Sequence, residues 1–295
     1  MKILYYTSAV SGTGRLVFGI SIGNALRRNG ISCEYSILSS SPYGHLAGDI
    51  PHREIPIESE EQLSPGNWEK SHLYNALREI NPDILLVNHC WFTLYHFMDQ
   101  LPCKKIYLSD QVIDAFFKIP LPGGDMVFNP RQYDQAFRIE PFNCPFEMEL
   151  INPLIIRNRD EIFSREEALQ RLGLKDKPPV AFYGFTGNPG DHERHWKKYS
   201  YLKEEGYQLI SSTSYQGGLF PIADYYNAFD LMICGAGYNQ FWEVIYFDKE
   251  TQERLMQKFH RQLRPGGFLF LGHSETLNGL DVDFTMVGST VYQRP

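Results

Sequence analysis

The sequence is poor in cysteine, has no excess of positive charge and has no long uninterrupted hydrophobic run. Its five cysteines form no Cys-x-x-Cys pair and no Cys/His spacing typical of zinc sites, so we expect no disulfide scaffold, no metal and a cytoplasmic location. The net charge of -7 argues against a nonspecific nucleic-acid binder. The uncharged apolar stretch at residues 84–98 is too short for a membrane-spanning helix.

The composition is that of a globular protein. Hydrophobic residues make up 43% and charged residues 21%, which excludes a largely disordered chain. A length of 295 residues allows one large domain or two of medium size, and we find no internal repeat. The N-terminal apolar run passes directly into a glycine-rich turn and lacks a signal-peptide cleavage pattern, so we expect it to form the first strand.

The first half of the chain alternates apolar runs with helical patterns. Strands are expected at 3–6, 31–38, 84–87 and 105–108. The turn at 11–14 precedes residues that recur at helical spacing, which are Leu16, Gly19, Ile20, Gly23 and Leu26. Such βαβ alternation predicts a doubly wound parallel sheet. Residues 119–150 are rich in Pro, Gly and Asn, which suits a region between two domains.

A second α/β pattern follows. A helix is expected at 165–172, where Ser164 and Glu167 form the pattern of a capping box. Further strands are expected at 179–183, 207–211 and 231–234, and glycine-rich loops follow the first and last of them. The chain therefore predicts two Rossmann-like α/β domains, residues 1–150 and 151–295.

The clearest candidate binding element runs from Gly235 to Glu243. An apolar strand leads into Gly235 and Gly237, and a helix is expected to begin just after them, near Tyr238 and Asn239. The free N–H groups and the dipole of such a helix start favour an anion such as a diphosphate. Glu243, about one and a half turns further on, is placed to accept hydrogen bonds from a ribose diol. The alternative is an ordinary βα turn with an exposed glutamate.

The stretch 221–237 resembles the nucleotide-sugar-binding half of GT-B glycosyltransferases, in particular the peptidoglycan N-acetylglucosaminyltransferase group. The resemblance covers residues 1–243. It implies that Gly237, Tyr238 and Asn239 lie near phosphate and that Glu243 holds the ribose. It also implies that the turn containing Gly12 and Gly14 faces the acceptor cleft. The matching loop of the second domain would contribute Gly184, Gly187 and Asn188.

One position departs from that family. Many members have a histidine after the first glycine-rich turn, where it acts as the base on the acceptor hydroxyl, and here Arg15 occupies that place. Arginine stays protonated, so it is no base, but it is suited to binding an anionic acceptor or phosphate, or to a solvated position at a helix start. His89 and Asp110 each follow an expected strand, where doubly wound sheets bind ligands, and are candidate replacement bases. A structural or surface role is the alternative for each.

The C-terminal tail, residues 244–295, resembles the end of CheR-type protein-glutamate methyltransferases of chemotaxis. The resemblance rests on Ile245-Tyr246-Phe247, expected as a strand, on the Arg-Pro-Gly-Gly stop at 264–267 and on the Gly-His-Ser-Glu-Thr run at 272–276. A strand at 268–271 and a hairpin at 284–292 are also expected. Neighbouring residues on a strand point to opposite faces, so we expect a structural role for His273 rather than a His–Ser couple.

Neither resemblance supplies a complete family member. The S-adenosylmethionine loop of the methyltransferases is absent before the tail, and the Asp-Gln pair that binds the donor sugar in the glycosyltransferases is absent after Glu243. We expect the tail to complete the second domain by generic α/β packing. A natural gene fusion, a recombination product and a misassembled sequence are all compatible with this chimeric pattern.

The leading hypothesis is a glycosyltransferase that moves a sugar from a nucleotide-diphosphate donor to an unknown acceptor hydroxyl without a metal or other cofactor. Membrane contact is expected only if the acceptor is a lipid. One alternative is a CheR-type methyltransferase that binds S-adenosylmethionine. The other is a catalytically inactive fusion or a nucleotide-binding protein.

Overall fold

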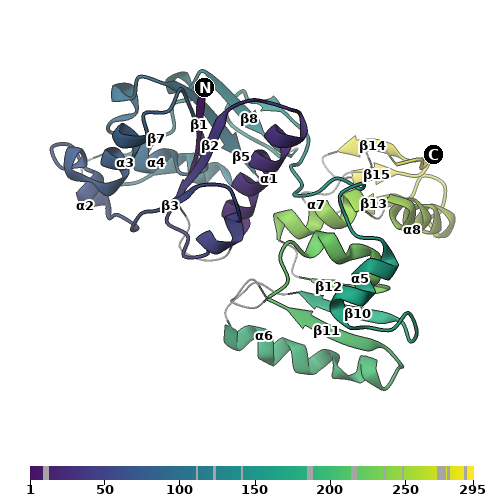
Figure 1. Cartoon of the computed structure of the whole chain (residues 1–295). Helices are drawn as coiled ribbons and strands as arrows, with labels where there is room; N and C mark the ends of the chain where they lie inside the picture. The colour runs from purple at the N-terminus through teal and green to yellow at the C-terminus, as the bar shows by residue number, and fades with distance from the viewer. Residues whose placement is uncertain are drawn as a thin grey trace.

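The structure is a computed structural model of the whole chain. It describes residues 1–8, 13–110, 112–121, 124–140, 142–184, 189–213, 218–234, 237–247, 249–270, 277, 280–288 and 291–295. Two parallel sheets lie in separate lobes, and we call them and the elements around them the N-lobe and the C-lobe (Figure 1).

The N-lobe contains a seven-stranded sheet in the order β3-β2-β1-β4-β5-β8-β9, and every neighbouring pair in it is parallel. The strands are β1 (Lys2–Thr7), β2 (Glu34–Ser39), β3 (His52–Glu54), β4 (Ile84–Asn88), β5 (Lys104–Ser109), β8 (Gln135–Arg138) and β9 (Glu149–Leu150). The strand order reverses between β1 and β4. Doubly wound sheets bind ligands outside the carboxyl ends of the strands at this point.

Helix α1 (Gly14–Arg28) packs tightly against this sheet. A Cβ added at Gly19 would lie 2.5 Å from the ring of Tyr5, and one at Gly23 would lie 2.7 Å from the ring of Tyr35. The two glycines therefore let the helix backbone approach two buried or half-buried aromatic rings on neighbouring strands. The Tyr5 hydroxyl then donates to the Arg15 carbonyl at 2.7 Å, which fixes the start of α1 over β1.

The remaining elements of the N-lobe are short. They are the helices α2 (Glu60–Leu63), α3 (His72–Ile80) and α4 (Trp91–Leu94), the 3-10 helices η1 (Gly44–Ala47), η2 (Trp68–Lys70), η3 (Met98–Gln100), η4 (Asp114–Phe117) and η5 (Pro130–Gln132), and the hairpin β6 (Lys118–Ile119) and β7 (Met126–Val127). The prediction that 119–150 lies between domains is wrong, because β8 and β9 extend the N-lobe sheet from this segment. The local sequence has weak strand propensity, but β8 is stabilised as a strand because it pairs in parallel with β5.

The C-lobe contains a three-stranded parallel sheet in the order β11-β10-β12. Its elements are α5 (Arg165–Leu172), β10 (Val180–Gly184), α6 (Pro189–Trp196), η6 (Lys197–Lys203), β11 (Gln208–Ser212), η7 (Ile222–Ala228), β12 (Leu231–Cys234) and α7 (Tyr238–Phe247). The Ser164 hydroxyl caps α5 by accepting the Glu167 N–H at 3.2 Å. The predicted α/β class with two Rossmann-like parallel sheets is confirmed, and a domain boundary near residue 150 stays a prediction.

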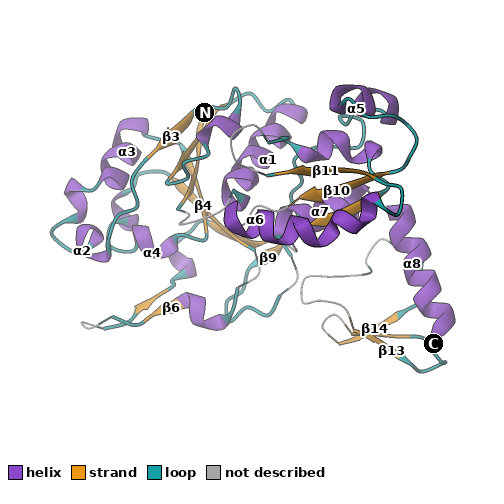
Figure 2. Ribbon diagram, turned by 90° about the horizontal axis from the view of Figure 1, so that it is seen from below, coloured by secondary structure: helices purple, strands orange, loops and turns teal. Residues whose placement is uncertain are grey.

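Among the described residues, the tail adds no strand to the C-lobe sheet. It consists of α8 (Lys249–Gln262) and a separate sheet of β13 (Phe268–Phe270), β15 (Val291–Gln293) and β14 (Thr285–Gly288), whose strands pair antiparallel. Met256, Leu277 and Tyr292 form the small buried core of the tail. Figures 1 and 2 both show this sheet apart from β10 and β11. The predicted hairpin is present, whereas the predicted completion of the second α/β layer is wrong.

The reason lies in the first residues of the tail, 245–247, which belong to α7. Ile245, Tyr246 and Phe247, predicted as a strand, form the last turn of α7. Phe247 packs edge-on against the Tyr226 ring at 5.4 Å, and the Arg159 guanidinium donates to the Tyr246 carbonyl at 2.6 Å. These contacts stabilise the helix end, so no strand from this segment pairs with β12.

Helices α1 and α7 face each other between the two lobes (Figure 1). Phe18 of α1 contacts the Tyr238 ring of α7 at 5.7 Å, and one buried apolar cluster continues from the N-lobe sheet to Tyr226 of η7. The buried Trp242 of α7 donates its indole N–H to Glu140, after β8, at 3.0 Å. Among the described residues, no helix is both long and apolar enough to span a membrane.

Candidate functional site: a cleft between the two lobes

A cavity of about 200 Å³ lies between the start of α1 and the start of α7. The N-lobe contributes strand ends and the first turn of α1, and the C-lobe contributes the ends of β10 and β11 together with α7. The lining includes most of the described residues that the sequence singles out, namely Gly14, Arg15, Asp110, Gly184, Gly237, Tyr238, Asn239 and Glu243. Tertiary structure thus brings Gly14, Gly237 and a candidate base, Asp110, to one cavity.

Gly237 borders an open part of this cavity. A Cβ added to it would meet no described atom within 4 Å, and its backbone φ lies outside the left-handed range. Neither crowding by the described residues nor backbone conformation therefore requires glycine here. The next residues begin α7, whose first turn contains no acidic side chain, so its free N–H groups are suited to an anion.

Asn239, in the first turn of α7, joins the two lobes. Its amide Nδ2 donates to the carbonyl of Gly14 at 2.9 Å, and Tyr238 beside it accepts the Leu154 N–H at 3.3 Å. The starts of α1 and α7 are therefore held next to each other.

Glu243 lies one and a half turns into α7 and is only 4% exposed, yet it lines the cavity. Its Oε2 accepts the hydroxyl of Tyr226 at 2.9 Å. Burial raises the pKa of Glu243 to about 7, although the hydrogen bonds from Tyr226 and from the Ile156 backbone act in the opposite direction. The carboxylate is therefore close to its midpoint of titration at neutral pH.

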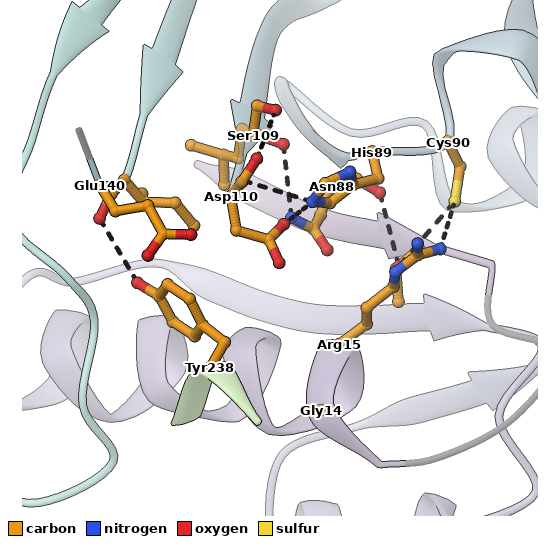
Figure 3. A network of polar contacts seen from close by, with 12 residues as sticks. Gly14, Arg15, Asn88, His89, Cys90, Ser109, Asp110, Glu140 and Tyr238 are labelled. Carbon is orange, nitrogen blue, oxygen red and sulfur yellow. Dashed lines mark hydrogen bonds and ion pairs between the residues drawn. The ribbon is translucent and has the colours of Figure 1, made fainter. Parts of the chain in front are cut away.

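His89 and Asp110 form a contacting pair at the ends of the neighbouring strands β4 and β5 (Figure 3). His89 Nε2 contacts the carboxylate Oδ1 of Asp110 and accepts the Asp110 backbone N–H at 3.3 Å. His89 is 2% exposed and has a positive φ of 60°, a strained conformation for a residue other than glycine. The Asp110 side chain is 29% exposed and lines the cavity, so the histidine lies behind the aspartate.

Burial sets the charge of this pair. It lowers the pKa of His89 to about 3, assisted by the nearby Arg15, and raises the pKa of Asp110 to about 6. At neutral pH the imidazole is therefore uncharged and the aspartate is mostly ionised. A carboxylate with a pKa close to the working pH suits general-base chemistry.

Arg15 is half-buried at the start of α1 (Figure 3). Its Nη1 donates to the Ser8 carbonyl at 2.7 Å and lies 3.8 Å from the Cys90 sulfur. Arg15 is therefore anchored at the helix start, and its role as an anion-binding residue or a solvated charge stays a prediction. Its positive charge lies near both members of the His89–Asp110 pair, where it favours the ionised aspartate and the neutral histidine.

The glycines of the site differ in what they do. A Cβ at Gly184 would lie 2.6 Å from the Phe182 ring, so packing accounts for that glycine, whereas a Cβ at Gly14 would make an ordinary contact of 3.6 Å with Asn239. Five residues named from the sequence lie outside the described residues: Gly12, Gly187, Asn188, Gly235 and His273.

Sequence reasoning missed Tyr226 and Asn88 as site residues. Tyr226 holds Glu243 from a different element, 17 positions earlier in the chain. Asn88 lines the cavity at the end of β4 and donates to the Leu108 carbonyl at 3.3 Å. No local pattern marks Tyr226, whereas the position of Asn88 at the end of an apolar strand was a usable signal. Within the described part of the chain, no group of three His, Cys, Asp or Glu side chains is arranged to hold a metal ion.

The fold is that of the GT-B glycosyltransferases, which have two Rossmann-like domains. The glycosyltransferase SsfS6 of Streptomyces sp. SF2575 superposes with a TM-score of 0.50 at 11% identity, over 88% of this chain and 86% of that one. UGT2 of Phytolacca americana, solved with UDP-2fluoro-glucose and pterostilbene, superposes with a TM-score of 0.51 at 11% identity, over 83% of this chain and 78% of that one. At this identity the likeness shows the fold alone.

The C-terminal segment has relatives of another kind. The family model described as "CheR methyltransferase, SAM binding domain" matches residues 227–293. The chemotaxis protein methyltransferase of Klebsiella aerogenes is 53% identical over 49 residues, 17% of this chain and 17% of that protein. The chain thus spans less than a fifth of that relative's length. Both predicted resemblances, to GT-B glycosyltransferases and to CheR methyltransferases in the tail, are confirmed.

Proposed function

We propose that this protein is a glycosyltransferase that uses a nucleoside-diphosphate sugar as donor. The observation that carries the proposal is the single cavity in which the start of α7 and Glu243 face Asp110 from the opposite lobe. The N–H groups of Gly237, Tyr238 and Asn239 would hold the diphosphate, and Glu243 would accept hydrogen bonds from the ribose.

The reaction follows from these positions. The Asp110 carboxylate takes the proton of an acceptor hydroxyl, and the acceptor oxygen forms a bond to the anomeric carbon of the sugar. The bond between that carbon and the diphosphate breaks, and the diphosphate leaves with the electron pair. The helix start at α7 stabilises the charge that develops on the leaving group. His89 holds the Asp110 backbone from behind by accepting its N–H, and Arg15 favours the ionised form of the Asp110 side chain.

Calorimetric titration with UDP, GDP and ADP tests the donor site. We expect at least one of them to bind, and we expect Glu243→Ala to weaken that binding by roughly tenfold because hydrogen bonds to a charged carboxylate are lost. Glu166→Gln, on the exposed first turn of α5, is the control and should bind as the parent protein does. The donor-site proposal fails if no diphosphate binds or if Glu243→Ala leaves the affinity unchanged.

A second candidate function is methyl transfer from S-adenosylmethionine, which the family match at 227–293 favours. The observed geometry supports methyl transfer less well than it supports glycosyl transfer. Residues 245–247 are helical, and β13, β15 and β14 form a sheet separate from β12.

Thermal unfolding with added ligands separates the two functions. A ligand present at 100 times its Kd stabilises a protein by about 2.7 kcal/mol, which corresponds to a measurable rise in Tm. We expect such a rise with a nucleoside diphosphate and none with S-adenosylmethionine or S-adenosylhomocysteine. A rise in Tm with only S-adenosylmethionine or S-adenosylhomocysteine would make methyl transfer the better-supported function.

A further inference from the structure

The Glu243 carboxylate, which lines the cleft, accepts hydrogen bonds from a buried tyrosine and from the Ile156 backbone. The hydroxyl of Tyr226 donates to Oε2 of Glu243 at 2.9 Å. The two residues come from different elements, η7 and α7, and both are almost fully buried, at 8% and 4% exposure. One carboxylate oxygen is therefore engaged from the protein side, while Glu243 as a whole still lines the cavity.

Packing fixes the ring of Tyr226. It contacts Phe247 edge-on at 5.4 Å, at the other end of the same helix that contains Glu243. The ring also belongs to the buried cluster that joins the lobes. Because the ring is immobilised by apolar contacts, its hydroxyl is directed at Glu243 without further loss of side-chain entropy.

Three further residues set the electrostatic surroundings of Glu243, namely Arg157, Asp224 and Cys234. Arg157, before α5, favours the ionised carboxylate, and Asp224 of η7 disfavours it. Arg157 and Asp224 are themselves paired at 2.7 Å, which limits the net effect of either. The thiol of Cys234 at the end of β12 has its own pKa raised, mainly by burial and also by Glu243. The hydrogen bond from Tyr226 is the largest contribution that favours ionisation of Glu243.

We propose that Tyr226 is a positioning residue: it orients the Glu243 carboxylate toward a ribose diol and so determines how strongly the cleft prefers ribonucleotides over nucleotides that lack ribose hydroxyls. The inference rests on the proposed donor site and identifies the part of the donor that is selected. Two adjacent ribose hydroxyls are both donors, and a carboxylate that is oriented and ionised accepts from both. A protonated or rotated Glu243 loses at least one of these bonds.

A pH dependence follows with a defined sign. Burial places the pKa of Glu243 at about 7, so the carboxylate form increases as the pH rises through that value. The preference for ribonucleotides should therefore increase between pH 6 and pH 8. Removing the Tyr226 hydroxyl removes a group that favours the ionised form, so the midpoint of this increase should move to higher pH.

The test compares Tyr226→Phe with the parent protein by calorimetry, using UDP and 2′,3′-dideoxy-UDP, or GDP and its dideoxy form if GDP binds more tightly. The ratio of the two affinities isolates the ribose contact, because ionisation of the diphosphate affects both nucleotides equally. We expect Tyr226→Phe to bind the ribonucleotide roughly fivefold to tenfold more weakly and the dideoxynucleotide unchanged. The pH midpoint of the ratio should shift upward.

Tyr225→Phe is the matched control. It makes the same chemical change one residue away, where the ring contacts Phe163, and it should leave the ratio unchanged. An unchanged ratio in Tyr226→Phe, or an equal loss for both nucleotides, overturns the inference and leaves the donor site standing. If the parent protein binds neither nucleotide, the donor site and the inference both fail. Tyr226→Phe keeps the buried ring, and its melting temperature shows whether the fold is intact.

Discussion

Replacing Asp110 with asparagine should lower the rate of sugar transfer by about 10²- to 10⁴-fold, the range typical of general-base catalysis. Asparagine keeps the shape of the side chain but cannot take a proton from the acceptor hydroxyl. Binding of the nucleoside diphosphate should be nearly unchanged, because Asp110 lies on the N-lobe side of the cavity. The measurement is release of nucleoside diphosphate from a nucleotide-sugar, with water or an added alcohol as acceptor.

The pH profile gives this prediction a second readout. Since burial raises the pKa of Asp110 to about 6, the rate of the parent protein should rise with pH through that value and fall below it. The rate of the Asp110→Asn variant should not show this rise with pH. Asp114→Asn, which changes an exposed carboxylate in the nearby η4, should retain both rate and profile. Full activity with an unaltered profile in Asp110→Asn would exclude Asp110 as the base.

Replacing Gly19 with valine should destabilise the whole N-lobe. A Cβ at this position lies 2.5 Å from the ring of Tyr5, which is fully buried and bound through its hydroxyl to the Arg15 carbonyl. Because the ring is fully buried and bonded at its hydroxyl, we expect a loss of about 2–3 kcal/mol from overpacking. That corresponds to a decrease in Tm of roughly 4–10 °C, measured by circular dichroism.

Helix propensity works against this loss, since valine is a slightly better helix former than glycine. A decrease in Tm therefore reports the clash rather than an intrinsic preference. Arg27→Val introduces the same side chain at an exposed position of α1 and removes only a surface ion pair with Asp49, so it should cost less than about 1 kcal/mol. Equal melting temperatures for the two variants would refute the close packing of α1 on β1.

The parts of the fold that the sequence predicted well are those with strong local signals. The strands at 84–87 and 231–234 are continuous apolar runs, and α5 begins and ends where its serine cap and its periodicity indicate. By contrast, β8 and β9 are short strands in a loop-like segment, and their pairing partners come from residues distant in sequence. Local propensity is weak in such strands, so the sheet decides their conformation.

In the tail, the sequence predicted a strand where the structure has a helix. Its sequence is similar to that of the methyltransferases, yet Ile245-Tyr246-Phe247 is helical in this chain. These β-branched and aromatic residues suit a strand or a buried helix equally, and the preceding residues extend α7 through them. The contacts of Phe247 with Tyr226 and of Arg159 with the Tyr246 carbonyl then favour the helix.

The sequence by itself determined that the chain is α/β, that glycine-rich turns follow three of its strands, and that His89 and Asp110 stand at strand ends. These are properties of periodicity and spacing along the chain. Only the tertiary structure decided that His89 lies behind Asp110, that Arg15 favours their charge state, and that Tyr226 holds Glu243. Each of these relations joins residues on separate elements, and its strength depends on burial, which a linear pattern does not record.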